Sequence, residues 1–431
     1  MQSQTHHAFA VLTRAARPCA LRALLLLPAL LSPTTALAAS GLTLDEATRL
    51  AAQRAPILDA RRARVESARQ ESLRAAALPD PMLTLGIDNL PVTGADAFDT
   101  GADFMTMKKI GLRQDIPARA KREAQRTLAE RNIDEADAQA QAEIFDVRRA
   151  TAEAWIDLWT AQRRLDALKT QREQSVLASR LARARVSGGA EPVADALATE
   201  VLVLELDNRI ETAESLRDAA QANLARWLGD SAPIIGNDAP DFISLPLSET
   251  QLLAAVDRLG PLLPITAQLE TAAAQVDAAR AEKRPDWSVA ASYGQRERGR
   301  SDMLMLEVGV GLPLFTRNRQ DRGVSAREAD YQAALATRED MRRQQIARLR
   351  SDIATWESLK RQITRDQDAL LPLTRDRTST ALAAYRAGAE ARPWLDARRD
   401  ELDTVVAHIE RMGELGRAWA ALAYLLEEPQ R

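Results

Sequence analysis

The chain has 431 residues, with 58 Lys and Arg, 61 Asp and Glu, and a formal net charge of −3. This mixed, mildly acidic composition argues against nucleic acid as a partner. Aromatic residues make up only 4% of the chain. We therefore expect long helices packed through small side chains rather than one large globular core.

The first 38 residues have the pattern of a secretory signal peptide. Three arginines precede a short apolar run from Leu24 to Leu31, and small residues before Ala39 fit a cleavage site. The run is too short to span a bilayer, so we expect cleavage rather than an anchor. The single cysteine, Cys19, lies in this segment, which excludes disulfides and thiolate sites from the rest of the chain. No later stretch is apolar for about 18 residues, so a position in a membrane would require strands.

Two long helical segments dominate the chain. The first runs from Ala118 to about Val186 without proline or glycine, and it consists largely of strong helix formers. At about 1.5 Å per residue it would be roughly 100 Å long. A second run of the same character is expected from about Asn318 to Ala387.

Each long helix is preceded by two segments in which apolar and polar residues alternate, as in strands. The expected strands are 82–89 and 104–114 in the first half, and 287–295 and 303–314 in the second. Each has about 9–11 residues, which suits a tilted strand that crosses a bilayer. A soluble, half-buried sheet alternates in the same way. Lys108 interrupts the apolar face of its strand.

Sequence landmarks recur in the same order in both halves, which indicates an internal duplication. The matched landmarks are the capping boxes Thr43 with Glu46 and Ser248 with Gln251, the prolines Pro56 and Pro261, Pro79 and Pro285, and Pro192 and Pro393. We predict two structural repeats, 39–230 and 248–431, joined by a linker at 231–247. Each repeat would contain a helix, two strands, a long helix, a turn and a returning helix.

Several short motifs resemble the TolC family of outer-membrane efflux channels, and its heavy-metal, CzcC-like branch. They are Leu42-Thr43-Leu44-Asp45-Glu46-Ala47, Leu78-Pro79-Asp80-Pro81, Ile110-Gly111-Leu112-Arg113-Gln114, Gly311-Leu312-Pro313-Leu314-Phe315 and Tyr385-Arg386-Ala387-Gly388. Each motif is weak alone, and the resemblance rests on their order and spacing.

The resemblance implies a mainly α fold with a small β part. Three protomers of four strands would close a twelve-stranded β-barrel in the outer membrane of a Gram-negative bacterium. Their long α-helical hairpins would form a cylinder in the periplasm. The resemblance also implies two protein partners, a periplasmic adaptor (membrane fusion) protein and an inner-membrane RND transporter.

The predicted function is a passive, gated export conduit for heavy-metal cations. One alternative is a channel for drugs or other organic compounds. Another, from a different class, is a periplasmic coiled-coil adaptor, which would need one hairpin and several extra β modules. An enzyme is not expected, because no nucleophile, phosphate loop or metal-ligand spacing appears and no cofactor is implied. His6 and His7 lie in the predicted signal peptide, and we expect the lone His408 to be a surface or packing residue.

The turns between the long helices and their returning helices are the candidate gate. Asp195 and Asp396 follow the two turns at matching positions, and in a trimer they could form acidic rings that favour cations. Alternatively, each carboxylate complements the first turn of its helix. Tyr385, Glu390 and Arg392 could form pairs that hold the tip shut, or lie in a solvated turn.

Methionines are concentrated in the predicted strands. By alternation Met82, Met303 and Met305 fall on the polar face, and Met105 and Met107 share a face with Lys109 and Arg113. Thioethers suit soft ions such as Cu(I), so these side chains could contact a metal in the lumen. Filling of irregular gaps is the alternative explanation.

Overall fold

The computed structural model describes residues 41–189, 192–229, 233–238, 240–297 and 299–426. The predicted signal peptide, with His6, His7 and Cys19, lies outside these ranges. The described part is mostly helical with one four-stranded antiparallel sheet, so the mainly α fold class with a small β part is confirmed. No helix among these residues is both long enough and apolar enough to cross a membrane.

The first half opens on the expected capping box. The Glu46 backbone donates to Thr43 Oγ1, and the Thr43 backbone donates back to the Glu46 carboxylate, which satisfies two free N–H groups. The elements that follow are α1 (Leu44–Arg54), α2 (Pro56–Ala75), β1 (Met82–Asp88), β2 (Met107–Ile116), α3 (Arg119–Ser187) and α4 (Val193–Leu228).

The second half repeats this order of elements. Ser248 and Gln251 form the second capping box. The elements are α5 (Glu249–Ala254), two 3₁₀ turns (Val256–Arg258 and Gly260–Leu262), α6 (Leu263–Ala281), β3 (Trp287–Gln295), β4 (Met303–Val310), a 3₁₀ turn (Thr316–Asn318), α7 (Gln320–Arg365), a π-helical turn (Asp366–Leu370), α8 (Leu371–Arg386) and α9 (Arg392–Ala423). The residue boundaries of the two repeats stay a prediction.

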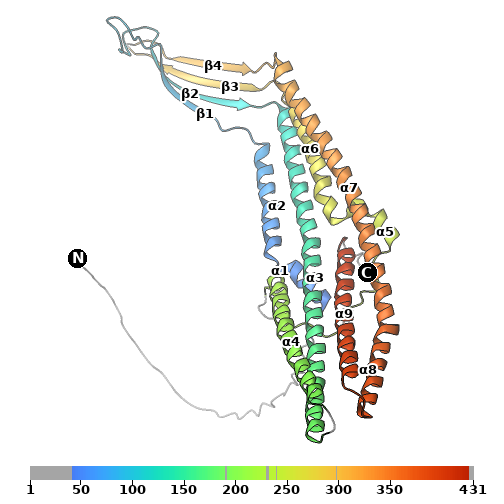
Figure 1. Ribbon diagram of the computed structural model, residues 1–431. Helices are drawn as coiled ribbons and strands as arrows, with labels where there is room; N and C mark the ends of the chain where they lie inside the picture. Colours follow the sequence, from blue (N-terminus) through green and yellow to red (C-terminus); the bar gives the residue numbers. More distant parts are fainter. Residues whose placement is uncertain (1–40, 190–191, 230–232, 239, 298, 427–431) are drawn as a thin grey trace, which may run out of the picture. The chain divides into compact units, whose positions relative to one another are not determined.

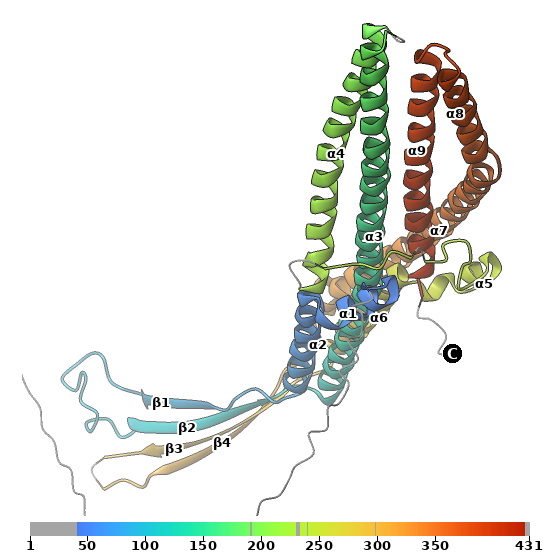
Figure 2. The ribbon, with the colours of Figure 1, turned by 90° about the horizontal axis from the view of Figure 1, so that it is seen from below.

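The long helices pair into two hairpins, α3 with α4 and α8 with α9 (Figures 1 and 2). Helix α3 has 69 residues and also packs against α1, α2, α6 and α9. It ends at Ser187, and Gly189 takes a φ of +71°, which a side chain would disfavour. The chain then turns, and Pro192 caps the start of α4.

The second long helix is not the uninterrupted rod that the sequence predicted. It divides at the π-helical turn into α7 and α8, directly before Pro372. Proline has no N–H to give to the preceding turn, and its ring clashes with the carbonyl four residues earlier. The chain accommodates this by widening one turn, in which the Leu371 N–H bonds to the Asp366 carbonyl.

Strand boundaries in the first half differ from those predicted. β1 stops at Asp88, because Asn89 adopts a φ of +56° and leaves the extended conformation. β2 starts at Met107 rather than at 104, because the Met105 N–H bonds to the Asp103 carboxylate in a turn. It continues to 116, past the predicted end at 114.

The last strand is shorter than predicted. β4 ends at Val310 rather than at 314. The Gly311 N–H leaves the ladder and donates to the Asp286 carbonyl at 2.8 Å. Pro313 has no N–H with which to continue the pairing.

Four tryptophans bind backbone segments across the middle of the helices. The indole N–H of Trp155 donates to the Leu42 carbonyl at 2.9 Å. The other three donate to the predicted linker: Trp159 to Asn237, Trp356 to Phe242 and Trp419 to Ser244. Phe242 is buried in the largest hydrophobic cluster, with Trp155 at its centre. The linker is therefore a packed segment that holds α3, α7 and α9 together.

Candidate functional site

The tip of the second hairpin contains a buried aromatic pair. Tyr385, in the last turn of α8, is only 2% exposed and stacks on Trp394 in the first turn of α9. The ring centroids are 5.2 Å apart and the planes differ by 7°. Ala391 is fully buried between the two helices. The stack therefore closes the hairpin across its turn.

A cation from the first hairpin covers this pair. The guanidinium carbon of Arg185, on α3, lies 4.5 Å from the Tyr385 ring centroid, and its Nη1 donates to the Tyr385 carbonyl at 3.2 Å. A guanidinium over an aromatic face is attracted by the ring quadrupole. Arg185 thus joins the tips of the two hairpins.

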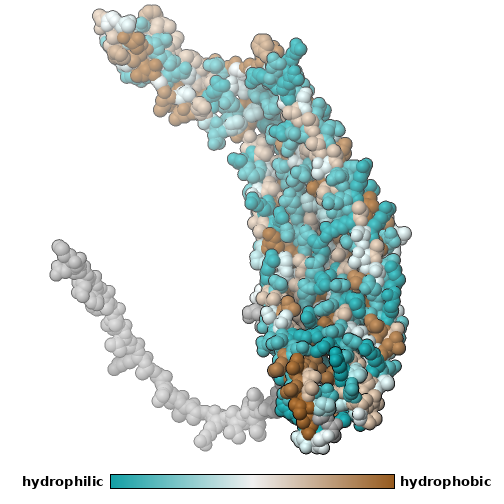
Figure 3. All heavy atoms as spheres, viewed as in Figure 1, coloured by the Kyte–Doolittle hydropathy of each residue, from teal (hydrophilic) through white to brown (hydrophobic). Residues whose placement is uncertain are grey.

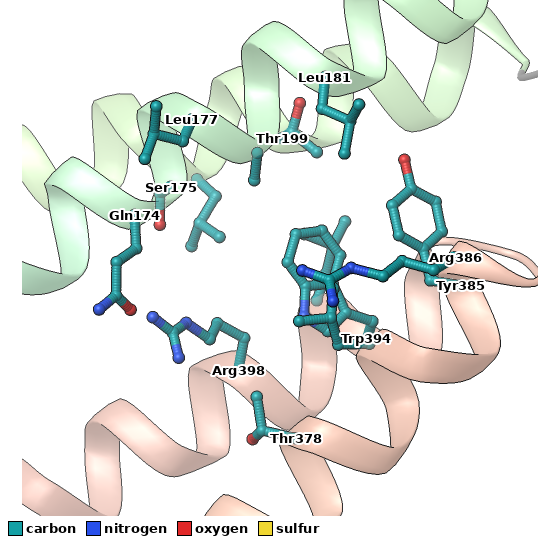
Figure 4. A pocket seen from close by; sticks show the side chains of 14 residues that line it. Gln174, Ser175, Leu177, Leu181, Thr199, Thr378, Tyr385, Arg386, Trp394 and Arg398 are labelled. Carbon is teal, nitrogen blue, oxygen red and sulfur yellow. The ribbon is translucent and has the colours of Figure 1, made fainter.

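A cavity of about 310 Å³ lies beside this contact, between the hairpins. Figure 4 shows Leu177 and Leu181 entering it from the first hairpin, and Trp394 and Arg386 from the second. Ser175 and Thr199 also line it and are buried. The hairpin tips are consequently not close-packed, although Arg185 bridges them.

The other predicted gate residues lie on a different surface. Glu390, Arg392 and Asp396 are exposed and line one open groove together with Arg377. Two carboxylates and two guanidinium groups share this groove, so within one protomer it is of mixed charge. The structure brings these three predicted residues together and places Tyr385 elsewhere.

The two predicted ring aspartates are not equivalent. Asp195 is half-buried in the first turn of α4, where its carboxylate complements the helix dipole. Asp396 lies beyond the first turn of α9, because that helix starts at Arg392, one residue before its proline. The dipole explanation therefore applies to Asp195 and not to Asp396.

Ion pairs connect the two hairpins along their length. They are Arg399 with Glu205, Arg209 with Asp403, Arg164 with Glu410 and Arg417 with Asp157, at 2.7–2.9 Å. Their side chains are partly exposed, and each such pair contributes little stability. Together they set how α9 lies against the first hairpin.

The sheet has one apolar face. Its order is β1-β2-β3-β4, and the paired residues on this face are mostly large and apolar, as in Leu85 with Ile110 and Val289 with Val308. Leu304 and Leu306 are more than 70% exposed there, and Figure 3 shows hydrophobic surface in this region. Lys108, the exception on this face, pairs with Glu297 at 2.6 Å beyond the end of β3.

The opposite face carries the predicted methionines but does not bring all of them together. Met82 lies on β1, across from Arg113, whereas Met303 and Met305 lie on β4. Two strands separate these edges within one protomer. Met107 is on the same face, near the start of β2, and Met105 lies outside the strand. Among the described residues no cluster of His, Cys, Asp or Glu could hold a metal ion.

The family described as outer membrane efflux protein matches residues 47–230 and 262–427, which include both hairpins and the sheet. The chain belongs to this family. The expected resemblance to the TolC family is thereby confirmed, as are the location in the outer membrane and the extension into the periplasm. Members of this outer membrane efflux protein family and their structural neighbours are channels and not enzymes.

Relatives of this outer membrane efflux protein agree with that assignment. The chain is 25% identical over 394 residues to the cobalt-zinc-cadmium resistance protein CzcC of Cupriavidus metallidurans, which covers 89% of each chain. Its fold is similar to that of CusC (TM-score 0.75, 16% identity, 89% of this chain and 92% of that one). It is also similar to VceC of Vibrio cholerae (TM-score 0.71, 17% identity, 88% and 94%). These two likenesses concern the fold alone.

One polar cluster of this efflux protein was not predicted. Asp366, in the π-helical turn, is buried and accepts a hydrogen bond from Arg411 Nε at 2.6 Å. His408 Nδ1 lies 3.3 Å from the same carboxylate, so the histidine has a specific partner. Pro372 was an available signal for the π-helical turn, because a proline within a long helical run marks a local break, but it does not indicate which residues contact Asp366.

Proposed function

We propose that this chain is the outer-membrane exit duct of a tripartite efflux system that exports heavy-metal cations. The main support for this proposal is the similarity of the chain to the cobalt-zinc-cadmium resistance protein over almost the whole of both chains. The duct is passive. A periplasmic adaptor and an inner-membrane RND transporter supply the substrate and the energy. The adaptor alternative is wrong for this chain, since it belongs to the efflux channel family.

Assembly as a homotrimer is part of the proposal. β1 and β4 are the two edges of the sheet, and their outer backbone groups have no strand partner among the described residues. Such groups require pairing in lipid. Antiparallel pairing of β4 of one copy with β1 of the next satisfies both edges, and the apolar sheet face then contacts outer-membrane lipid.

An apolar stripe on the first hairpin supports the same assembly. Val193, Leu197, Val201 and Leu204 are each more than half exposed and follow one face of α4. A single exposed apolar residue is ordinary, but a continuous stripe marks a contact surface. We assign this stripe to the neighbouring hairpins in the trimer.

The gate in this proposal is the contact between the hairpin tips. Arg185 and the Tyr385–Trp394 stack hold the tips together, and opening separates them. In this proposal Asp195 has both roles: it complements the start of α4 within each protomer, and its three copies form an acidic ring at the entrance of the trimer. Asp396 lies in a groove with Arg377, Arg392 and Glu390, where its charge is partly balanced, and this groove is the site for adaptor docking.

Growth inhibition of a deletion strain tests the proposed cargo. We expect sensitivity to one or more of the Zn, Cd, Co, Cu and Ag salts, restored by the plasmid-borne gene, and unchanged sensitivity to a panel of lipophilic drugs. Sensitivity to the drugs alone would overturn the metal assignment and favour the organic-compound channel. Cross-linking in outer-membrane fractions should yield a trimer, and a monomer alone would contradict the assembly.

A further inference from the structure

Three methionine positions of the polar face of the sheet lie at or next to Gly294 in the strand register. Met107 is only 7% exposed, although it lies on this face. Its Sδ lies so close above Gly294 that a Cβ at that position would be 2.6 Å from the sulfur. Met303 is the register partner of Gly294 on β4, and Met305 follows on the same face. Thioether groups from β2 and β4 therefore flank one glycine of β3.

The glycine is what makes this arrangement possible. A side chain at 294 would occupy the space in which the Met107 sulfur lies. Neighbouring strands are about 4.8 Å apart, so Met303 starts within one strand spacing of the covered glycine. Methionine has three side-chain torsions and adapts to irregular spaces, so its sulfur can turn toward that of Met107.

The charges around the cluster are compatible with a bound cation. Lys109 is the β2 partner of Gly294, and its Nζ lies 3.3 Å from the Asp88 carboxylate, which offsets its charge. Glu307 follows Met305 on the same face of β4 and is exposed. Ser292, the partner of Met305, is small and polar. The three methionines thus lie on the polar face of the sheet, with Met107 buried and Met303 exposed.

We propose that Met107, Met303 and Met305 form a binding site for a soft monovalent cation, Cu(I) or Ag(I). This inference rests on the proposed export function and names a class of cargo for it. Thioethers are soft ligands that select Cu(I) over harder ions such as Mg²⁺ and Mn²⁺. They are also neutral, so they bind weakly enough to release the ion, as a transit site requires. Met82 is not part of the site, because it pairs with Arg113 at the opposite end of β2 from Met107, and because β2 and β3 separate its strand from β4.

Silver titration of the purified full-length protein tests this site. Methionine is labelled with ¹³C in its methyl group, and the methyl resonances are assigned with single Met→Leu variants. On adding silver nitrate we expect the resonances of Met107, Met303 and Met305 to shift together at one equivalent per protomer, and that of Met82 to stay unchanged. Each of M107L and M303L should weaken silver binding by about tenfold or more.

The matched control is M82L/M105L, which removes two strand-region methionines outside the cluster and should bind silver as the wild type does. The triple variant M107L/M303L/M305L should lose the site. Equal silver affinity in the triple variant, or shifts confined to Met82, would overturn the proposal and leave gap filling as the role of these side chains. Size-exclusion profiles of the single variants M303L and M305L, whose residues are partly exposed, check that assembly is intact.

The silver titration and the growth assay of the deletion strain test the binding site and the proposed function separately. If the deletion strain is sensitive to Zn and Cd and the triple variant restores resistance, while the protein binds no silver, the soft-cation site is wrong and the conduit stands. If the strain has no metal sensitivity but the titration behaves as expected, the cargo assignment of the conduit is wrong and the binding site stands.

Discussion

Arg185 and Tyr385 are 200 positions apart in the chain, yet the guanidinium of one covers the ring of the other at the hairpin tips. The contact connects α3 of the first hairpin with α8 of the second. A cation–π contact that is partly desolvated contributes about 0.5–2 kcal/mol. A gate held in part by this contact should open more readily without it.

We therefore predict that Arg185→Gln raises the open probability of the channel in planar bilayers by about fivefold, which corresponds to about 1 kcal/mol. Arg183→Gln is the matched control, because Arg183 pairs with Glu200 within the first hairpin and does not bridge the tips. An equal increase in both arginine variants would contradict the assignment of the gate.

The Asp366–Arg411 pair gives a second prediction. The Asp366 side chain is only 6% exposed and the Arg411 side chain 25%. Removing Arg411 leaves the buried Asp366 carboxylate with His408 as its neighbour, so Arg411→Met should lower the stability of the folded protein by about 1–3 kcal/mol. Thermal unfolding followed by circular dichroism measures the change.

Arg417→Met provides the comparison for that variant. Arg417 pairs with Asp157 at 2.7 Å on the same helix α9, but both side chains are more than 40% exposed. Loss of an exposed pair costs about 0–1 kcal/mol. Similar unfolding midpoints for the two variants would show that the buried pair does not hold the π-helical turn to α9.

Close backbone contact at Gly41 gives a third prediction. A Cβ at this position would lie 2.4 Å from the Ile235 carbonyl group. The hydrogen bond from Leu42 N–H to the Ile234 carbonyl, at 2.8 Å, depends on this approach. Gly41→Ala should therefore destabilise the fold by about 1–3 kcal/mol through steric overlap.

Gly323→Ala should have the opposite effect. Gly323 lies within α7 with open space around it, and alanine favours a helix over glycine by about 0.5–1 kcal/mol. Urea unfolding of both variants compares them. A loss of stability in Gly323→Ala as large as that in Gly41→Ala would contradict the steric argument.

Glu153 on α3 gives a prediction that depends on pH. Burial raises the pKa of its carboxyl above the ordinary value of 4.5, and the nearby Arg149 offsets this only in part. The folded protein therefore favours the protonated form. The protonated Glu153 carboxyl therefore makes its full contribution to stability below the ordinary pKa. This contribution is lost as the pH rises through the higher pKa of the folded state.

Glu153→Gln replaces this carboxyl with a group that cannot ionise. We expect the variant to unfold at a higher temperature than the wild type near pH 8, and the difference to shrink toward pH 4. Asp166→Asn, further along α3 and exposed, controls for a general change in net charge. If the unfolding temperatures of Glu153→Gln and the wild type differ by the same amount from pH 4 to pH 8, burial does not raise the pKa of this carboxyl.

How far each feature was predictable depends on whether its cause is local. α3 was predicted within a residue or two because helix propensity acts along the chain, and no proline or glycine interrupts it. The capping boxes at Thr43 and Ser248 were predicted for the same reason, since their hydrogen bonds span three residues. Pro372 also acts locally, and the break between α7 and α8 follows from it. We missed that break because we did not take Pro372 into account when predicting the helix.

Contacts between distant segments could not be predicted in this way. The segment 231–247, rich in Pro, Gly and Asp, was predicted only as a linker, and only the packed fold places Trp159, Trp356 and Trp419 where their indole groups bind its carbonyls. Likewise, nothing near His408 in the sequence indicates Asp366, 42 residues earlier.

The alternation of each strand, by itself, determined which residues share a face, because side chains project to opposite sides with a period of two. That placed Met82, Met303 and Met305 on the polar face, and Met105 and Met107 on the face of Lys109 and Arg113, although Met105 lies outside β2 in the structure. Only the tertiary structure decided which of them meet. Strand order puts Met82 at the far edge, the register of β3 and β4 places Met303 beside Gly294, and the Met107 side chain reaches over the same glycine. The physical reason is that pairing between strands depends on hydrogen bonds and packing between residues remote in sequence, which no local pattern encodes.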